Sequence, residues 1–329
     1  MESNRPKIGI ALSGASGRAI AHIGVLEVFK ENNIPIDYIV GCSSGALIAS
    51  AYATDTMEPL KEQLKSMTIP KLLGMFTIRN ANGGLFHLNN IDPHFEVYTK
   101  GLNFEQTAPK VGFVATDINS GELITIKTGD MIKAIKAAVA VPGLFEPVII
   151  DGRILVDGGL VNIVPTKAAR EMGADIVIGV NIAATKFIYE KRLPIWRGYK
   201  FLTRLLGLQF VREKLIPMLS SRIFFQFDSQ SDILEEENIK VPGVFSMLAK
   251  ALDHSLVISE QWTESDMACD LMLEPRVKHF GKAEFDMLDQ IYKEGRRAAL
   301  EAVPYIRSLI ERKTMQHATK QVKEIARSK

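Results

Sequence analysis

Residues 39–52 read IVGCSSGALIASAY, and this stretch decides the fold. The apolar run up to Val40 predicts a buried strand, and the alanine-rich run after Gly45 predicts a helix. Between them lies the Gly-x-Ser-x-Gly pattern of a nucleophile elbow, which runs from Gly41 to Gly45 with Ser43 at its centre. Glycine suits both ends of this turn, because the serine is strained and neighbouring chain passes where a side chain would clash. The alternative is a tight turn in which Ser43 is a plain helix N-cap.

The surrounding sequence alternates between predicted strands and predicted helices. Residues 7–12 (KIGIAL) predict a buried strand, and residues 19–33 predict the helix that leads to the elbow strand. Parallel strands with helical crossovers are expected from this order. Two hairpins are predicted, the second of them closed by Asp151-Gly152. The remaining predicted elements are the first hairpin (110–118 and 122–127), helices over 58–66, 92–100, 131–141 and 165–172, and strands over 175–182 and 271–277.

The composition excludes several classes of protein. The chain has 329 residues, 47% of them hydrophobic, and a formal net charge of +2. It therefore has enough apolar sequence for a substantial core, and it is neither disordered nor a general nucleic-acid binder. The two cysteines, Cys42 and Cys269, exclude a disulfide scaffold and fit a reducing compartment. With no secretory apolar region and no apolar run of about 18 residues, we expect a cytoplasmic protein without a transmembrane helix.

Residues 186–222 differ in character from the rest of the chain. They contain nine basic and two acidic residues, among which lie the aromatic residues Trp196, Phe201 and Phe210. One interpretation is a helical cap whose apolar face covers the core and whose charges are solvated. The other is an interfacial segment that contacts anionic lipid, which would place the protein peripherally at the inner membrane surface.

We expect a single α/β domain over residues 1–311, in which residues 186–262 form a helical cap or insertion. The C-terminal part is expected to be helical over residues 282–312, with a break near Pro304. The last residues, 312–329, are polar and basic, so we expect a flexible tail there.

A serine nucleophile needs a base, and Asp157 is the best-placed candidate. It ends a predicted strand and precedes Gly158 and Gly159, so its carboxylate can project beyond the sheet with little crowding. A carboxylate that is held close and partly desolvated can take the serine proton directly. The alternative for Asp157 is a simple turn residue. No histidine directly follows a well-predicted strand, where a triad histidine would be expected; the six are His22, His87, His94, His254, His279 and His317.

The loop Gly14-Ala15-Ser16-Gly17-Arg18 is the candidate oxyanion hole. A small-residue loop between a strand and a helix N-terminus offers successive backbone N–H groups to an anion. Arg18 either adds charge or solvates the start of the helix. The glycine spacing fits neither a dinucleotide motif nor a Walker A motif, and no residue spacing predicts a metal site. We therefore expect no cofactor and no metal.

Together these motifs resemble the patatin-like phospholipases, and most closely the bacterial members of the neuropathy-target-esterase type. The loop with its following helix, the elbow and the Asp-Gly-Gly motif at Asp157 occur in the family's order. The resemblance covers residues 7–182 well and the C-terminal third loosely. It implies a three-layer α/β/α fold with a mainly parallel sheet, and hydrolysis of phospholipid, lysophospholipid or related lipid esters. It further implies that Ser43 is the nucleophile, Asp157 the base, and residues 14–17 the oxyanion hole, with Arg18 near it.

One departure from the family pattern keeps other functions open. The family loop usually reads Gly-Gly-Gly, whereas this chain has Gly14-Ala15-Ser16. A positive φ at Ala15 or Ser16 would cost roughly 1 kcal/mol or more each. The alternatives are a non-catalytic patatin-like protein that binds a partner, and a transacylase that passes the acyl group to an alcohol or lysolipid through the same two residues.

Overall fold

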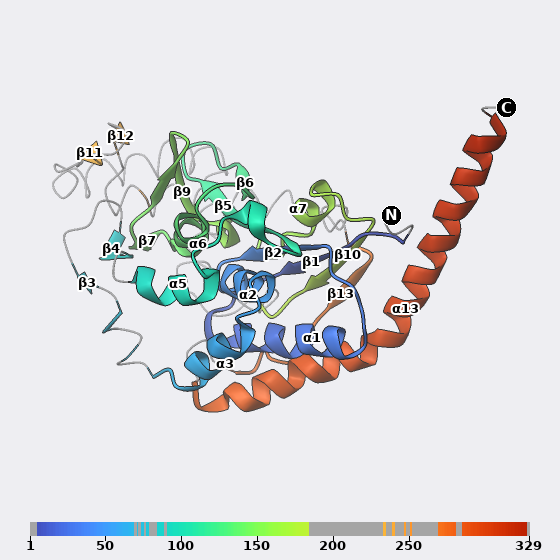
Figure 1. The fold of residues 1–329 in the computed structure, drawn as a ribbon. Coiled ribbons are helices and arrows are strands. Elements are labelled where there is room, and N and C mark those ends of the chain that lie inside the picture. Colours follow the sequence, from blue (N-terminus) through green and yellow to red (C-terminus); the bar gives the residue numbers. More distant parts are fainter. Residues whose placement is uncertain are drawn as a thin grey trace, which may run out of the picture.

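The computed structural model describes residues 5–68, 71, 74–75, 77–78, 84–88, 91–183, 233–234, 239–240, 247, 251, 269–280 and 285–327. An eight-stranded sheet lies at its centre (Figure 1). Its strand order is β13-β10-β1-β2-β5-β9-β8, and β6 pairs with β5. The strands are β1 (Ile8–Leu12), β2 (Tyr38–Cys42), β5 (Lys110–Asp117), β6 (Leu123–Ile126), β8 (Val148–Ile150), β9 (Arg153–Asp157), β10 (Ile176–Val180) and β13 (Leu271–Leu273).

The sheet is mainly parallel, as the sequence predicts. Strands β13, β10, β1, β2 and β5 are parallel to one another, whereas β6 and β9 run antiparallel to β5, and β8 runs antiparallel to β9. Both predicted hairpins are present. Two small sheets lie outside the central one: β3 (Thr77–Ile78), β4 (Gly84–His87) and β7 (Gly143–Phe145) form the first, and β11 (Ile233–Leu234) with β12 (Ile239–Lys240) the second.

Helices cover both faces of the sheet, which completes the expected three layers. On one face, Ile10 and Ile39 pack in the large core with α1 (Ile20–Glu31) and α2 (Ser44–Ala53). On the other face, Ala11 and Val40 pack with Ala169 of α7 (Thr166–Glu171). Because both faces are buried, the strands are apolar throughout rather than alternating. The other helices are η1 (Ser16–Ala19), α3 (Met57–Lys65), α5 (Asp92–Thr99), η3 (Phe104–Gln106), α6 (Met131–Val139), η4 (Gly158–Leu160), η7 (Phe285–Met287) and α13 (Leu288–Arg327).

The helix α13 runs along α1 at very close range (Figure 1). A Cβ at Gly295 would lie 2.0 Å from the carbonyl oxygen of Ala21, and a Cβ at Gly24 would lie 2.5 Å from that of Tyr292. Two glycines therefore permit the contact between the backbones. Arg296 adds an ion pair to Glu31 at 2.7 Å.

The C-terminal region differs from the sequence-based expectation. The break predicted near Pro304 is absent, because α13 is one helix that includes Pro304 and continues to Arg327. Figure 1 shows that α13 changes direction part way along, and an internal proline is a common cause of a bend in a helix. Residues predicted as a flexible tail, 312–329, are helical as far as Arg327; their flexibility stays a prediction.

The predicted helical cap over residues 186–262 falls almost wholly outside the described residues, and the basic segment 186–222 lies outside them entirely. Within the described part of the cap, β11 and β12 form an antiparallel pair. Over the part of the chain that the structure describes, no helix is both long and apolar enough to cross a membrane.

Candidate active site

The predicted elbow has the backbone geometry of a nucleophile elbow. Strand β2 ends at Cys42, α2 begins at Ser44, and Ser43 between them has φ 52° and ψ −127°. A Cβ at Gly41 would lie 2.4 Å from the Cα of Ala46. Ser43 makes no side-chain capping hydrogen bond to α2, so the plain N-cap interpretation has no support here. The turn is strained at its serine and leaves no room for a side chain at its first glycine.

Asp157 lies beside this elbow. Strand β5 separates β2 from β9, and in it Val114 faces Cys42 while the adjacent Ala115 faces Asp157. Across β5, the Sγ of Cys42 lies 3.9 Å from the Oδ1 of Asp157. Ser43 is the next residue after Cys42. The structure therefore places Asp157, the predicted base, beside the residue that precedes Ser43, the predicted nucleophile, although 114 positions separate Ser43 from Asp157 in the chain.

The Asp157 carboxylate is buried and held in place. Asp157 is 6% exposed, and its Oδ1 accepts a hydrogen bond from the Gly159 N–H at 2.8 Å. This bond also caps η4, so the turn role considered for Asp157 exists alongside its place near the elbow. A Cβ at Gly158 would lie 2.6 Å from the Val114 carbonyl oxygen, which explains why the residue after Asp157 is glycine.

Cys42 does not compete as a nucleophile. Burial, and to a lesser extent the charge of Asp157, raise the pKa of the Cys42 thiol well above its usual range. The thiol therefore stays protonated at neutral pH, and only the thiolate is strongly nucleophilic.

The predicted oxyanion loop touches the elbow at Gly14. A Cβ at Gly14 would lie 2.5 Å from the Ser43 Cβ and 3.3 Å from the Ser43 Oγ. Only glycine permits this approach. The loop is also tied to the elbow by Ser44, whose Oγ accepts the Ala15 N–H at 3.0 Å. The sequence analysis did not predict this role of Ser44. Its position directly after the predicted nucleophile is the feature that could have indicated it.

Three of the five predicted oxyanion donors have partners elsewhere. The Ala15 N–H donates to Ser44, the Arg18 N–H donates to the Ala15 carbonyl at 3.3 Å, and the Gly14 N–H contacts the Cys42 thiol. The candidate N–H donors from this loop therefore narrow to those of Ser16 and Gly17.

The Arg18 side chain has a structural contact that the sequence did not reveal. It is buried, its Nε donates to the Phe280 carbonyl at 2.9 Å, and its Nη2 donates to the Lys278 carbonyl at 3.1 Å. Arg18 thus anchors the oxyanion loop to the segment that precedes α13. This contact is local packing between residues far apart in the chain, so no sequence motif signals it.

Ser16 has the positive φ that we considered for a loop with Ala15 and Ser16 in place of two glycines. Ser16 has φ 55°, in the left-handed region, whereas Ala15 has φ −172°, an extended value. We expect Ser16→Gly to raise the free energy of unfolding by about 0.5–1 kcal/mol, because relief of a left-handed strain of about 1–2 kcal/mol exceeds the entropy that glycine adds to the unfolded chain. Urea denaturation measures the change. The matched control is Ala15→Gly, which has no strain to relieve and should lower stability by about 0.4–1 kcal/mol; equal effects of the two variants would contradict the assignment.

The described histidines have partners elsewhere. His87 pairs with Glu146, His94 bonds to Gln63, and His317 pairs with Asp175. His22 is fully buried in α1 and bonds to the Ser13 carbonyl oxygen. His279 stacks near Phe280, and His254 lies outside the described residues.

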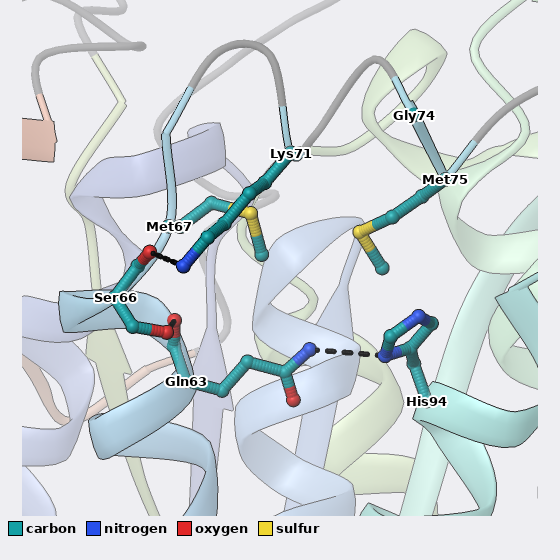
Figure 2. Close-up of a pocket in the computed structure, with 7 residues that line it drawn as sticks. All are labelled: Gln63, Ser66, Met67, Lys71, Gly74, Met75 and His94. Carbon is teal, nitrogen blue, oxygen red and sulfur yellow. Dashed lines mark hydrogen bonds between the residues drawn. The ribbon is translucent and has the colours of Figure 1, made fainter.

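A cavity of about 420 Å³ opens between α3 and α5. Figure 2 shows its walls, in which the Met67 and Met75 side chains face the cavity and Gln63 reaches across to His94. None of its seven lining residues belongs to the predicted site, so this cavity is separate from the Ser43–Asp157 pair.

The family model for patatin-like phospholipase matches residues 10–170. Residues 10–170 form a patatin-like phospholipase domain. This range contains the oxyanion loop, the elbow and the Asp157 motif, so the resemblance read from the sequence is confirmed.

Several relatives of this patatin-like domain carry NTE in their names. An uncharacterized NTE family protein of Mycobacterium bovis is 28% identical over 180 residues, which cover 55% of this chain and 50% of that protein. Patatin-like phospholipase domain-containing protein 6 of Mus musculus is 26% identical over 298 residues, covering 88% of this chain and 20% of that protein. Lysophospholipase NTE1 of Cryptococcus neoformans is 29% identical over 192 residues, which cover 54% of this chain and 11% of that protein. The chain thus matches half or less of each relative's length.

Proposed function

We propose that this protein hydrolyses acyl esters of phospholipids, lysophospholipids or related lipids through a Ser43–Asp157 dyad and a covalent acyl-enzyme. The observation that carries the proposal is the convergence of Gly14, Ser43 and Asp157. Gly14 lies against Ser43, and the residue before Ser43 lies 3.9 Å from the Asp157 carboxylate. The patatin-like domain and the name of the Cryptococcus relative, a lysophospholipase, support a lipid ester as substrate.

The reaction proceeds in two half-reactions. Asp157 takes the proton from the Ser43 Oγ as this oxygen attacks the ester carbonyl. The oxyanion is stabilised by the N–H groups of Ser16 and Gly17 in the loop and by the positive end of α2. Asp157 then protonates the leaving alcohol, which leaves the acyl group on Ser43. A water molecule, deprotonated by Asp157, attacks this ester, and the acid is released as Ser43 regains its proton.

Exposed apolar side chains near the site suit an acyl chain. The Asp157 N–H donates to the Ala140 carbonyl at 2.9 Å. Val141 directly follows Ala140 and is 39% exposed, and Leu144, three residues further on, is 40% exposed. An apolar rim next to the proposed base favours a substrate with a hydrocarbon chain over a small polar ester.

Fluorophosphonate labelling tests this proposal. An activity probe that phosphonylates activated serines should label the wild-type protein at Ser43, as identified by mass spectrometry of the peptide. Absence of labelling would refute both the hydrolase and the transacylase and leave a non-catalytic binding protein. If labelling occurs, product analysis separates the two enzymes, because a transacylase yields an acylated alcohol or lysolipid instead of a free acid.

We further propose that residues 186–222 dock the protein on anionic membrane at the inner membrane surface, where its lipid substrate lies. The support is the concentration of nine basic residues beside aromatic ones in a chain of net charge +2. Binding to anionic vesicles should weaken with salt and be lost when Lys200, Arg204, Arg212 and Lys214 become Gln, with turnover of a soluble ester retained. Liposome co-sedimentation measures this. Equal, salt-insensitive binding to neutral and anionic vesicles would exclude electrostatic docking.

A further inference from the structure

Cys42 is a buried thiol that the proposed reaction does not use. It lies at the end of β2, directly before Ser43, and has no exposed surface. Because burial and the charge of Asp157 raise the pKa of this thiol, it keeps its hydrogen at neutral pH. A protonated thiol can donate that hydrogen, although it is a weaker donor than a hydroxyl. Cys42 therefore places a donor at the elbow.

The hydrogen of this thiol is directed at the proposed base. The Sγ of Cys42 donates to the Oδ1 of Asp157 at 3.9 Å, a weak hydrogen bond that joins β2 to the end of β9. The same oxygen accepts the Gly159 N–H at 2.8 Å. Donors from two sides of one carboxylate oxygen restrict the rotation of the Asp157 side chain.

The sulfur is itself held from the oxyanion loop. The backbone N–H of Gly14 donates to the Cys42 thiol. Because this N–H approaches a lone pair of the sulfur, the S–H bond points away from the loop. The peptide that carries the Gly14 N–H is fixed on its other side, where the Ser13 carbonyl oxygen lies 2.8 Å from the Nε2 of His22. The thiol thus connects a fixed loop to the carboxylate.

We propose that Cys42 is a positioning residue whose thiol, oriented by the Gly14 N–H, holds the Asp157 carboxylate beside Ser43. The inference rests on the proposed esterase function. Cys42 exchanges no proton with the substrate and forms no bond to it, because it acts through Asp157. A donor to a carboxylate favours the charged form, so the thiol also helps Asp157 to stay ionised as the pH falls.

The test compares variants that differ in one donor. Cys42→Ala removes the thiol, and Cys42→Ser restores a donor at the same position. We expect Cys42→Ala to move the acid limb of kcat/KM for a p-nitrophenyl ester to higher pH by about half a unit, the effect of one weak hydrogen bond.

The plateau value of kcat should fall by about tenfold in Cys42→Ala, because a misaligned carboxylate loses part of the roughly 10²–10⁴-fold contribution of a positioned base. Cys42→Ser should return both quantities toward wild type. Cys269→Ala removes the chain's other cysteine, which precedes β13 at the far side of β10 and β1, and this matched control should change neither.

Other charged groups around Asp157 are the same in all these variants. Asp117 of β5 and Arg153 of β9 pair with each other at 3.5 Å. The helix α6, which packs on β5 and β9, carries Lys133 and Lys136. Because none of these residues is altered, a shift of the acid limb reports the loss of the Cys42 donor.

A second measurement observes the carboxylate without turnover. In protein labelled with ¹³C-aspartate, the Asp157 carboxyl resonance is assigned by its absence in Asp157→Asn and is then titrated with pH. Its midpoint should rise in Cys42→Ala and return in Cys42→Ser. Thermal unfolding by circular dichroism shows whether each variant is folded, and Cys42→Val, which also lacks the donor, replaces Cys42→Ala if that variant is unfolded.

Two results would overturn the inference. One is an unmoved Asp157 titration in a folded variant without the donor, whatever its kcat. The other is a Cys42→Ser variant that fails to restore the titration, since the side-chain volume would then be the cause. If the wild-type protein neither reacts with fluorophosphonate nor hydrolyses esters, the proposed function fails, and the Asp157 titration alone decides the role of Cys42.

Discussion

Replacing Ser43 by Ala is expected to reduce ester hydrolysis by about 10⁶-fold, the loss seen when the nucleophile of a serine hydrolase is removed. The change deletes the attacking oxygen and little else. Alanine keeps the Cβ, so the strain at φ 52° is unchanged, and Ser43 makes no capping bond that the variant would lose. Turnover of a p-nitrophenyl ester measures the effect.

The Ser43→Ala protein should remain folded, with an unchanged circular dichroism spectrum. Ser44→Ala is an informative companion, because it removes the neighbouring hydroxyl that holds the Ala15 N–H but leaves the nucleophile. A folded Ser43→Ala variant with undiminished turnover would eliminate Ser43 as the nucleophile.

Replacing Asp157 by Asn is expected to lower kcat by at least about 10²-fold, the contribution of a positioned general base. The amide oxygen of asparagine can still accept the hydrogen bond from the Gly159 N–H, so the turn at η4 keeps its cap. What is lost is the basic oxygen. Steady-state kinetics with the same soluble ester give the result.

Single histidine-to-glutamine variants are the control for this assignment. Each should keep measurable turnover, because the described histidines have partners outside the Ser43–Asp157 pair. His254, which lies outside the described residues, belongs in the same series. One histidine variant as inactive as Asp157→Asn would point to a conventional triad.

The turns that define the fold could be predicted because each is fixed by a few neighbouring residues. The elbow combines glycine at Gly41, a strained serine and a small-residue helix, all within one short stretch. Asp151 and Gly152 both have positive φ, 50° and 72°, which is the two-residue hairpin geometry that their sequence favours. The residue types within each turn determine its backbone conformation, so these turns can be predicted from the sequence.

Contacts between distant residues could not be predicted in the same way. Arg18 looks like a charge beside the oxyanion loop, but its guanidinium bonds to Phe280, 262 positions later. The bond from His22 to Ser13 likewise depends on how α1 packs under the loop, and a histidine inside a helical pattern carries no such information.

Pro304 shows how packing overrides a local signal. A proline usually ends a helix, because it removes a backbone hydrogen bond and clashes with the preceding turn. Here Val303 and Ile306, on either side of Pro304, are both buried in the core that α13 shares with α1. Burial of these side chains offsets the cost of the proline, so the helix continues past it.

The crossing of α1 and α13 has a consequence for biosynthesis. Helix α1 follows the oxyanion loop and contains His22. The helix that packs on α1, α13, begins only at Leu288. Strand β13, next to β10, is also encoded after residue 270. While the chain emerges from the ribosome, the elbow and the loop are therefore made long before the helix that closes over α1, and this partly covered intermediate is the stage at which a chaperone would have most to protect.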